Sequence, residues 1–281
     1  MAEVDAPVRV IVHAGFHKTG TTSLQVYLEN NRAALAPYLA YYGKSEMPDL
    51  DEAARLYGLR PFPWRLAAFR SALRVFLTGL PPAPVIALSR ERFCGAMPGL
   101  RGWHGRRRMS YAPTAIALAR VLTEEIARRF GPGTRVEFLY TLRAREPWLH
   151  SLYGHLLRVT RLRDDFDRFR RRFPARFSLE TEAALIAGAL APVPVHTAPL
   201  EALAEARAGP AQALFDLLDL PAEVTAALPP ARRWNRGHPA KTEARFLHLN
   251  RAGGGARTRR AIKEDLGRRQ RARPEKPGPE R

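Results

Sequence analysis

The segment from His13 to Gln25, HAGFHKTGTTSLQ, contains the residue types of a loop that binds phosphate. Gly15 and Gly20 have the spacing of the glycines in a Walker A loop, G-x-x-x-x-G-K-[ST]. Two threonines follow the second glycine, however, and the lysine of the segment, Lys18, lies inside the loop. Glycines let backbone N–H groups approach an anion, the lysine adds positive charge, and the hydroxyl groups add donors. The segment therefore predicts a rearranged phosphate-binding loop.

The elements around this loop place it between a strand and a helix. Residues 8–15, VRVIVHAG, form a short apolar run of the kind found in buried parallel strands. After the threonines, apolar side chains recur at helical spacing from Leu24 to Leu35. A helix that starts at such a loop directs its N-terminal N–H groups at a bound anion. The alternative is a tight strand-to-helix turn whose polar residues have no ligand.

Two further predicted strands lack the acid that a nucleoside triphosphatase uses to hold magnesium. Such enzymes place a hydroxyl group after the loop lysine and an aspartate at the end of another strand. The segments APVIALSRE (83–91) and RVEFLYTLR (135–143) do not end in aspartate, and Glu91 is the acid nearest a strand end. We therefore expect a phosphate ligand that is bound without a metal ion.

Strands alternate with helices along the rest of the chain. Helical patterns cover residues 52–79, with a break at RPFPW, and residues 114–130, 146–158, 180–190 and 210–220, while VPVHTA (193–198) is a fourth short strand. This order predicts an α/β fold with a mainly parallel sheet. From Gly253 the chain is highly charged with few large apolar residues, so we expect a domain over 1–252 and a basic, flexible tail over 253–281.

Two motifs resemble the sulfotransferases that use 3′-phosphoadenosine 5′-phosphosulfate (PAPS). GFHKTGTTSLQ resembles the family's 5′-phosphosulfate loop. The family's 3′-phosphate site has an arginine at the end of a strand and a serine eight residues later in the next helix, as Arg143 and Ser151 are here. The likeness covers residues 8–30 and 136–155, and the segment 232–251 is similar to bacterial members.

The resemblance implies a three-layer P-loop-like α/β fold, with a central, mainly parallel sheet flanked by helices, and a transfer reaction. PAPS would be the co-substrate and 3′,5′-adenosine bisphosphate (PAP) the product, with no metal. Lys18 would stabilise the departing phosphate oxygen, and Arg143 and Ser151 would bind the 3′-phosphate. The residues expected at the 5′-phosphate are Lys18, Thr19, Gly20, Thr21, Thr22 and Ser23.

The general base that accepts the acceptor's proton is either an acid or a histidine in this family. Glu91 follows the second predicted strand, near the position where many bacterial members have an acid. His17 lies inside the loop, and His104 lies in the basic segment RGWHGRRR (101–108). Each of these side chains also has an ordinary structural explanation, as an ion-pair partner or a surface histidine. We expect Glu91 first and His17 second.

The net charge of +19, from 46 basic and 27 acidic residues, invites a nucleic-acid partner. The basic runs mostly lack interleaved aromatic residues, however, and solvated basic faces also explain them. We therefore expect a polar or anionic acceptor, such as a carbohydrate or lipid headgroup, because arginines crowd segments 101–108 and 158–173. A kinase-like enzyme and a non-enzymatic nucleic-acid-binding protein stay open as alternatives.

Composition limits the remaining possibilities. Cys94 is the one cysteine, so an internal disulfide and an all-cysteine metal site are excluded. No apolar run reaches the ~20 residues of a membrane-spanning helix, and the first residues do not have the pattern of a secretion signal. We expect a cytoplasmic protein without a membrane span.

Overall fold

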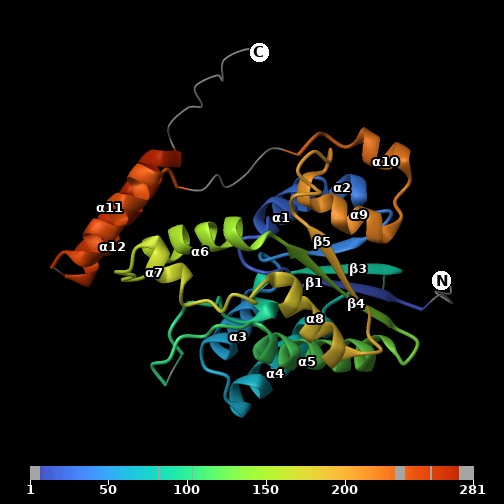
Figure 1. Cartoon of the computed structure of the whole chain (residues 1–281). Coiled ribbons are helices and arrows are strands. Elements are labelled where there is room, and N and C mark those ends of the chain that lie inside the picture. Colours follow the sequence, from blue (N-terminus) through green and yellow to red (C-terminus); the bar gives the residue numbers. More distant parts are fainter. Residues whose placement is uncertain (1–6, 82, 103, 232–237, 254, 272–281) are drawn as a thin grey trace. The chain divides into compact units, whose positions relative to one another are not determined.

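The computed structural model describes residues 7–81, 83–102, 104–231, 238–253 and 255–271. It contains a five-stranded, all-parallel sheet with the strand order β2-β3-β1-β4-β5, and helices cover the sheet, as Figure 1 shows. The strands are β1 (Arg9–His13), β2 (Ala40–Tyr42), β3 (Val85–Ser89), β4 (Arg135–Leu142) and β5 (Val195–Pro199). The predicted three-layer α/β class is therefore confirmed.

The chain divides into two compact units, and the sheet belongs to the first. The first unit comprises residues 1–148 and 175–235, and the second comprises residues 149–174 and 236–281. The helices of the first unit are α1 (Thr21–Asn30), α2 (Arg32–Leu35), α3 (Pro48–Leu59), α4 (Pro63–Thr78), α5 (Ala112–Phe130), α8 (Leu179–Leu190), α9 (Gln212–Leu218) and α10 (Ala222–Ala227), with short 3-10 helices at Glu91–Cys94 and Gly209–Ala211. The 3-10 helix Glu91–Cys94 follows β3 directly and carries the predicted base.

Alternation along the strands divides the core of the first unit into two layers. Ile11, Ala87 and Leu139 belong to a buried cluster with side chains of α1 and α9. Their strand neighbours Val10 and Phe138 are fully buried and, because successive side chains point to opposite faces, lie on the side that α3, α4, α5 and α8 cover (Figure 1). Both faces of the sheet are thus buried, as a parallel sheet requires.

The order of the strands defines where a ligand is expected. The chain leaves β1 toward β2, on the far side of β3, and leaves β4 toward β5 in the opposite direction. In open parallel sheets, ligands bind outside the carboxyl ends of the strands at the point where the connections diverge. That point lies between β1 and β4, where the glycine loop and Arg143 leave the sheet.

The second unit is helical, and part of the predicted tail is folded in it. Its helices are the greater part of α6 (Arg145–Val159), α7 (Phe166–Arg170), α11 (Ala240–Arg251) and α12 (Ala256–Arg271). Lys263 on α12 is buried and donates from Nζ to the carbonyl oxygens of Leu157 and Thr160, both at 2.7 Å, at the end of α6. The segment expected to be flexible therefore contains a helix with a buried contact. The boundary at residue 252 stays a prediction, and residues 272–281 lie outside the described residues.

Within the described ranges, no helix is both long enough and apolar enough to cross a membrane.

Glu182 on α8 fixes the start of α5 beside the loop. Its Oε2 accepts hydrogen bonds from the backbone N–H groups of Tyr111 at 2.8 Å and Ala112 at 2.9 Å, and from the hydroxyl of Ser110 at 2.8 Å. These N–H groups belong to the first turn of α5 and have no partner within the helix. The buried carboxylate thereby sets the position of Tyr111, whose ring lies against Phe16 of the loop.

We expect Glu182→Ala to lower the free energy of unfolding by about 2–3 kcal/mol, because it leaves the buried N–H group of Tyr111 without its acceptor and removes the stronger acceptor of Ala112. Glu182→Gln keeps one acceptor oxygen and should cost less. Glu180→Ala is the matched control, since Glu180 is an exposed acid in the same first turn of α8. Urea unfolding measures all three variants. Equal losses for the Ala variants at the two positions would contradict the capping role.

Candidate functional site

The backbone of the glycine loop bends sharply directly after β1. Gly15, Lys18 and Gly20 have positive φ angles of 38°, 72° and 88°. Glycine adopts such angles readily, but a lysine in this region is uncommon and costs about 1–3 kcal/mol. Loops that alternate between right- and left-handed residues turn successive N–H groups toward one hollow, which suits an anion. The strain at Lys18 therefore needs compensation from its neighbours.

Two side chains hold carbonyl groups of the loop in place. Trp148 donates from Nε1 to the carbonyl of His17 at 2.9 Å, and Arg143 donates from Nη1 to the carbonyl of Lys18 at 3.3 Å. In a trans peptide the N–H group points opposite to the carbonyl. The N–H groups of Lys18 and Thr19 therefore point away from Trp148 and Arg143. This arrangement presents donors, and not acceptors, on the other side of the loop.

The loop leads directly into α1. Gly20 is the N-cap residue in the left-handed conformation, and among the described residues no side chain caps the helix through a hydrogen bond. The first turn of this ten-residue helix thus directs its N–H groups and the positive end of its dipole at the loop. Thr22 is exposed and Ser23 half-buried. Helix and loop together form a cradle of donors.

The hydroxyl groups of Thr19 and Thr21 are buried inside the loop. Thr19 Oγ1 donates to the carbonyl of Phe16 at 2.6 Å and lies 2.7 Å from Oγ1 of Thr141 on β4. Thr21 Oγ1 is 3.5 Å from the same carbonyl, which is a long contact. The Thr19 side chain therefore connects the loop to the sheet. Its hydroxyl is engaged in these bonds, so the backbone N–H of Thr19 is the group that is expected to contact a ligand.

Glu91 lies at the end of β3 in a cluster of charged groups. Its Oε2 accepts from Arg90 Nη1 at 2.9 Å and from Gln25 Nε2 at 3.4 Å. Arg90 is buried and also pairs with Asp51, which binds Arg92 at 2.6 Å. Burial alone would raise the pKa of Glu91, but the permanent charges of Arg90 and Arg92 help to hold that pKa below its ordinary value. Glu91 is therefore ionised at neutral pH, as a general base must be.

His17, the second candidate base, lies between the loop and α5. Its ring stacks on Tyr111 with 5.8 Å between centroids and 9° between planes, and its Nδ1 is 3.6 Å from Cys94 Sγ. Burial lowers the pKa of His17 to about 4, which Glu91 opposes and the charges of Arg90, Arg92 and Lys18 reinforce. The ring is therefore neutral at neutral pH and lies within electrostatic range of both Lys18 and Glu91.

The structure thus assembles most of the predicted site around one loop. Lys18, His17, Glu91 and Arg143 all lie at the carboxyl ends of β1, β3 and β4. Ser151 lies on α6 within the second unit, so its contact with a 3′-phosphate stays a prediction. His104 is exposed in the 99–108 hairpin, where its Nδ1 accepts from the N–H of Arg106 at 3.1 Å.

Three polar residues beneath the loop are not among the predicted site residues: His13, Ser89 and Gln25. His13 and Ser89 are the last residues of β1 and β3 and lie side by side in the sheet. Both are buried, and Gln25 reaches Ser89 from α1. One sequence feature could have indicated His13 and Ser89: each is a polar residue at the end of an apolar run, VRVIVH and VIALS.

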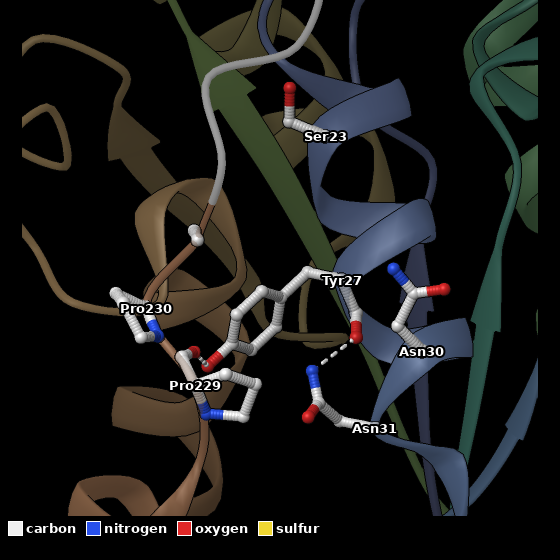
Figure 2. A pocket seen from close by; sticks show the side chains of 7 residues that line it. Ser23, Tyr27, Asn30, Asn31, Pro229 and Pro230 are labelled. Carbon is white, nitrogen blue, oxygen red and sulfur yellow. Dashed lines mark hydrogen bonds between the residues drawn. The ribbon is translucent and has the colours of Figure 1, made fainter.

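A cavity of about 340 Å³ opens along α1 and begins at Ser23 (Figure 2). Tyr27 forms one wall with its ring against Pro229 and Pro230, and its hydroxyl donates to the carbonyl of Pro229 at 2.8 Å. The remaining lining residues are Asn30, Asn31 and Ala231. This volume lies at the lower end of the range for small-molecule sites. The cradle of donors therefore adjoins a hollow with room for part of a small molecule.

Comparison with family models and with curated proteins finds no match for this chain.

Proposed function

We propose that this chain is a PAPS-dependent sulfotransferase, which moves a sulfuryl group from PAPS to a hydroxyl or amine of an acceptor. The observation that carries the proposal is the cradle at the carboxyl ends of β1 and β4. There Trp148 and Arg143 bind the carbonyl groups of His17 and Lys18 by hydrogen bonds, so that Arg143 lies next to the loop. A ligand with two separate phosphate groups fits a site with two adjoining groups of donors.

The residues present suit such a donor molecule. The loop N–H groups, the start of α1 and Lys18 would hold the 5′-phosphosulfate. Arg143 would hold the 3′-phosphate. Its side chain is half-buried, and this burial lowers the pKa of the guanidinium, which the nearby charge of Glu201 opposes. A partly desolvated cation gains more from an anionic partner than an exposed one does. Ser151 would complete the 3′-phosphate site.

For a hydroxyl acceptor, the proposed chemistry transfers SO₃ from a phosphate oxygen to the acceptor. The acceptor hydroxyl attacks sulfur, the bond between sulfur and the bridging oxygen breaks, and the bonding electrons stay on the phosphate of PAP. Lys18 would stabilise the charge that develops on that oxygen. Glu91 would take the acceptor's proton, because it is ionised and held in one orientation by Arg90 and Gln25. His17, neutral and beside it, is the second candidate for this role.

The proposed acceptor is a polar or anionic molecule such as a carbohydrate or lipid headgroup. Arginines of the 99–108 hairpin support this choice: Arg101 and Arg108 donate to the carbonyl oxygens of Gly105 and Leu59, at 2.8 and 3.0 Å, which are neutral acceptors. Segment 158–173 supports the choice less, because Asp164 forms ion pairs with Arg168 and Arg172 and so offsets part of the positive charge there. A screen with labelled PAPS tests this assignment. Preference for small neutral phenols would contradict it.

We expect PAP to bind without magnesium and to raise the melting temperature. At a concentration 100 times its Kd, a ligand stabilises the folded state by about 2.7 kcal/mol. Thermal melts with PAP in EDTA, compared with ATP and magnesium, measure the effect. Stabilisation by ATP–magnesium alone would favour a kinase-like enzyme. Salt-sensitive binding of DNA or RNA, without any effect of PAP, would favour the nucleic-acid-binding alternative.

We expect Arg143→Ala and Lys18→Ala to separate donor binding from turnover. Arg143→Ala should weaken PAP about tenfold or more, as loss of a charged hydrogen bond does, and should weaken 5′-AMP less, because 5′-AMP lacks the 3′-phosphate and senses only the lost contact with the loop. Lys18→Ala should lower kcat about 100-fold and donor affinity far less, because its charge acts on the transition state. Calorimetry and the labelled-PAPS assay provide the two readouts.

Arg145→Ala serves as the matched control, since Arg145 is a half-buried arginine two residues further on that donates to the carbonyl of Phe177 at 3.1 Å. If all three variants lose PAP and 5′-AMP affinity equally, Arg143 does not read the 3′-phosphate.

A further inference from the structure

His13, the last residue of β1, carries a buried polar atom without a partner. Its ring is 1% exposed, and Nδ1 lies 2.8 Å from Oγ of Ser89 on the neighbouring strand. Across the residues that the structure describes, Nε2 of the same ring has no hydrogen-bond partner. Buried polar atoms are almost always satisfied in folded proteins, so an orphan of this kind calls for an explanation.

The orphan nitrogen lies directly beneath the glycine loop. A Cβ atom placed on Gly15 would lie 2.8 Å from Nε2 of His13 and also 2.8 Å from Oγ1 of Thr21. The ring and the hydroxyl therefore face the same small space, which exists because Gly15 has no side chain. Thr21 makes only the 3.5 Å contact to Phe16 there, so its hydroxyl is free to turn.

The neighbours of His13 are compatible with a proton on Nε2. Gln25 donates from Nε2 to the carbonyl of Ser89 at 3.0 Å and to its Oγ at 3.3 Å. A serine hydroxyl that accepts from Gln25 can still donate its own proton to Nδ1 of His13, and the role of His13 proposed below requires this arrangement. Burial lowers the pKa of His13 to about 4, so the ring is neutral at neutral pH. A neutral ring that accepts at Nδ1 carries its hydrogen on Nε2, facing the loop.

We propose that His13 positions Thr21 for anion binding: when the anion occupies the loop, Nε2–H donates to Oγ1 of Thr21, and the Thr21 hydroxyl donates its own proton to the anion. This inference rests on the proposed function, which supplies the anion as the 5′-phosphate of PAP. The contact satisfies the orphan nitrogen only in the bound state. It also extends a polar chain that runs from Glu91 through Gln25, Ser89 and His13 to Thr21.

The inference is tested by a double-mutant cycle with PAP as the probe. His13→Phe keeps the ring but removes both nitrogens, and Thr21→Val keeps the shape but removes the hydroxyl. We expect each to weaken PAP about tenfold and the double variant to weaken it no further, because both break one relay. His13→Gln, with a donor near the position of Nε2, should restore affinity to within about threefold. His248→Phe, at an exposed position on α11, is the control.

A spectroscopic measurement on the unaltered protein accompanies the cycle. With ¹⁵N-labelled histidine, His13 should show the Nε2–H form before PAP is added, and its Nε2 signal should shift on binding. This readout stands even if His13→Phe does not fold.

Three results would overturn the proposed relay: wild-type affinity in folded His13→Phe, single losses that multiply in the double variant, or an Nε2 signal unmoved by bound PAP. Multiplying losses would mean that His13 and Thr21 contact the anion separately. Absence of PAP binding by the wild-type protein is a distinct outcome, because it overturns the proposed function itself.

Discussion

The site depends on the pairing of β1 with strands on both sides. His13 lies level with Ser89 of β3 and with Leu139 of β4, so three parallel strands deliver their carboxyl ends to one place. Because β4 continues to Leu142, it forms a wall beyond the end of β1. The loop contacts this part of β4 through the hydrogen bond between the hydroxyl groups of Thr19 and Thr141. Arg143 is the first residue after the strand. A shift in this register would separate the loop from the arginine that holds its carbonyl.

One buried arginine, Arg90, positions the charged side chains at the end of β3. Arg90 is 3% exposed, and a cation so far from water is tolerated only with well-placed anionic partners. It has two, Asp51 from α3 and Glu91 from the following 3-10 helix. Arg90 therefore requires Glu91 to stay beside the loop, and this explains why a carboxylate with substantial desolvation is ionised there. The candidate base owes its position to a structural ion pair.

Local sequence patterns predicted most strands and helices, but they did not predict contacts between residues that are distant in the sequence. The runs VRVIVHAG, APVIALSRE and RVEFLYTLR became β1, β3 and β4, and the break at RPFPW separates α3 from α4. β2 was missed because it has three residues and one fully buried side chain, too short for alternation to show. Asp51 and Arg90 are 39 residues apart in the sequence, and His17 and Trp148 are 131 residues apart. No spacing rule reveals such pairs, since the fold alone brings them together.

Three local costs meet in the loop, and the ligand of the proposed function would offset all three. Lys18 holds a strained backbone angle, His13 buries an unpaired nitrogen, and Arg143 is a partly desolvated cation. Each feature lowers the stability of the empty protein. In the proposed function, an anion in the cradle would accept from the N–H groups that the strained turn orients, would give the Thr21–His13 pair an acceptor, and would add opposite charge beside Arg143. Local costs concentrated at one place are expected of a functional site, and they favour a binding loop over a tight turn of similar sequence.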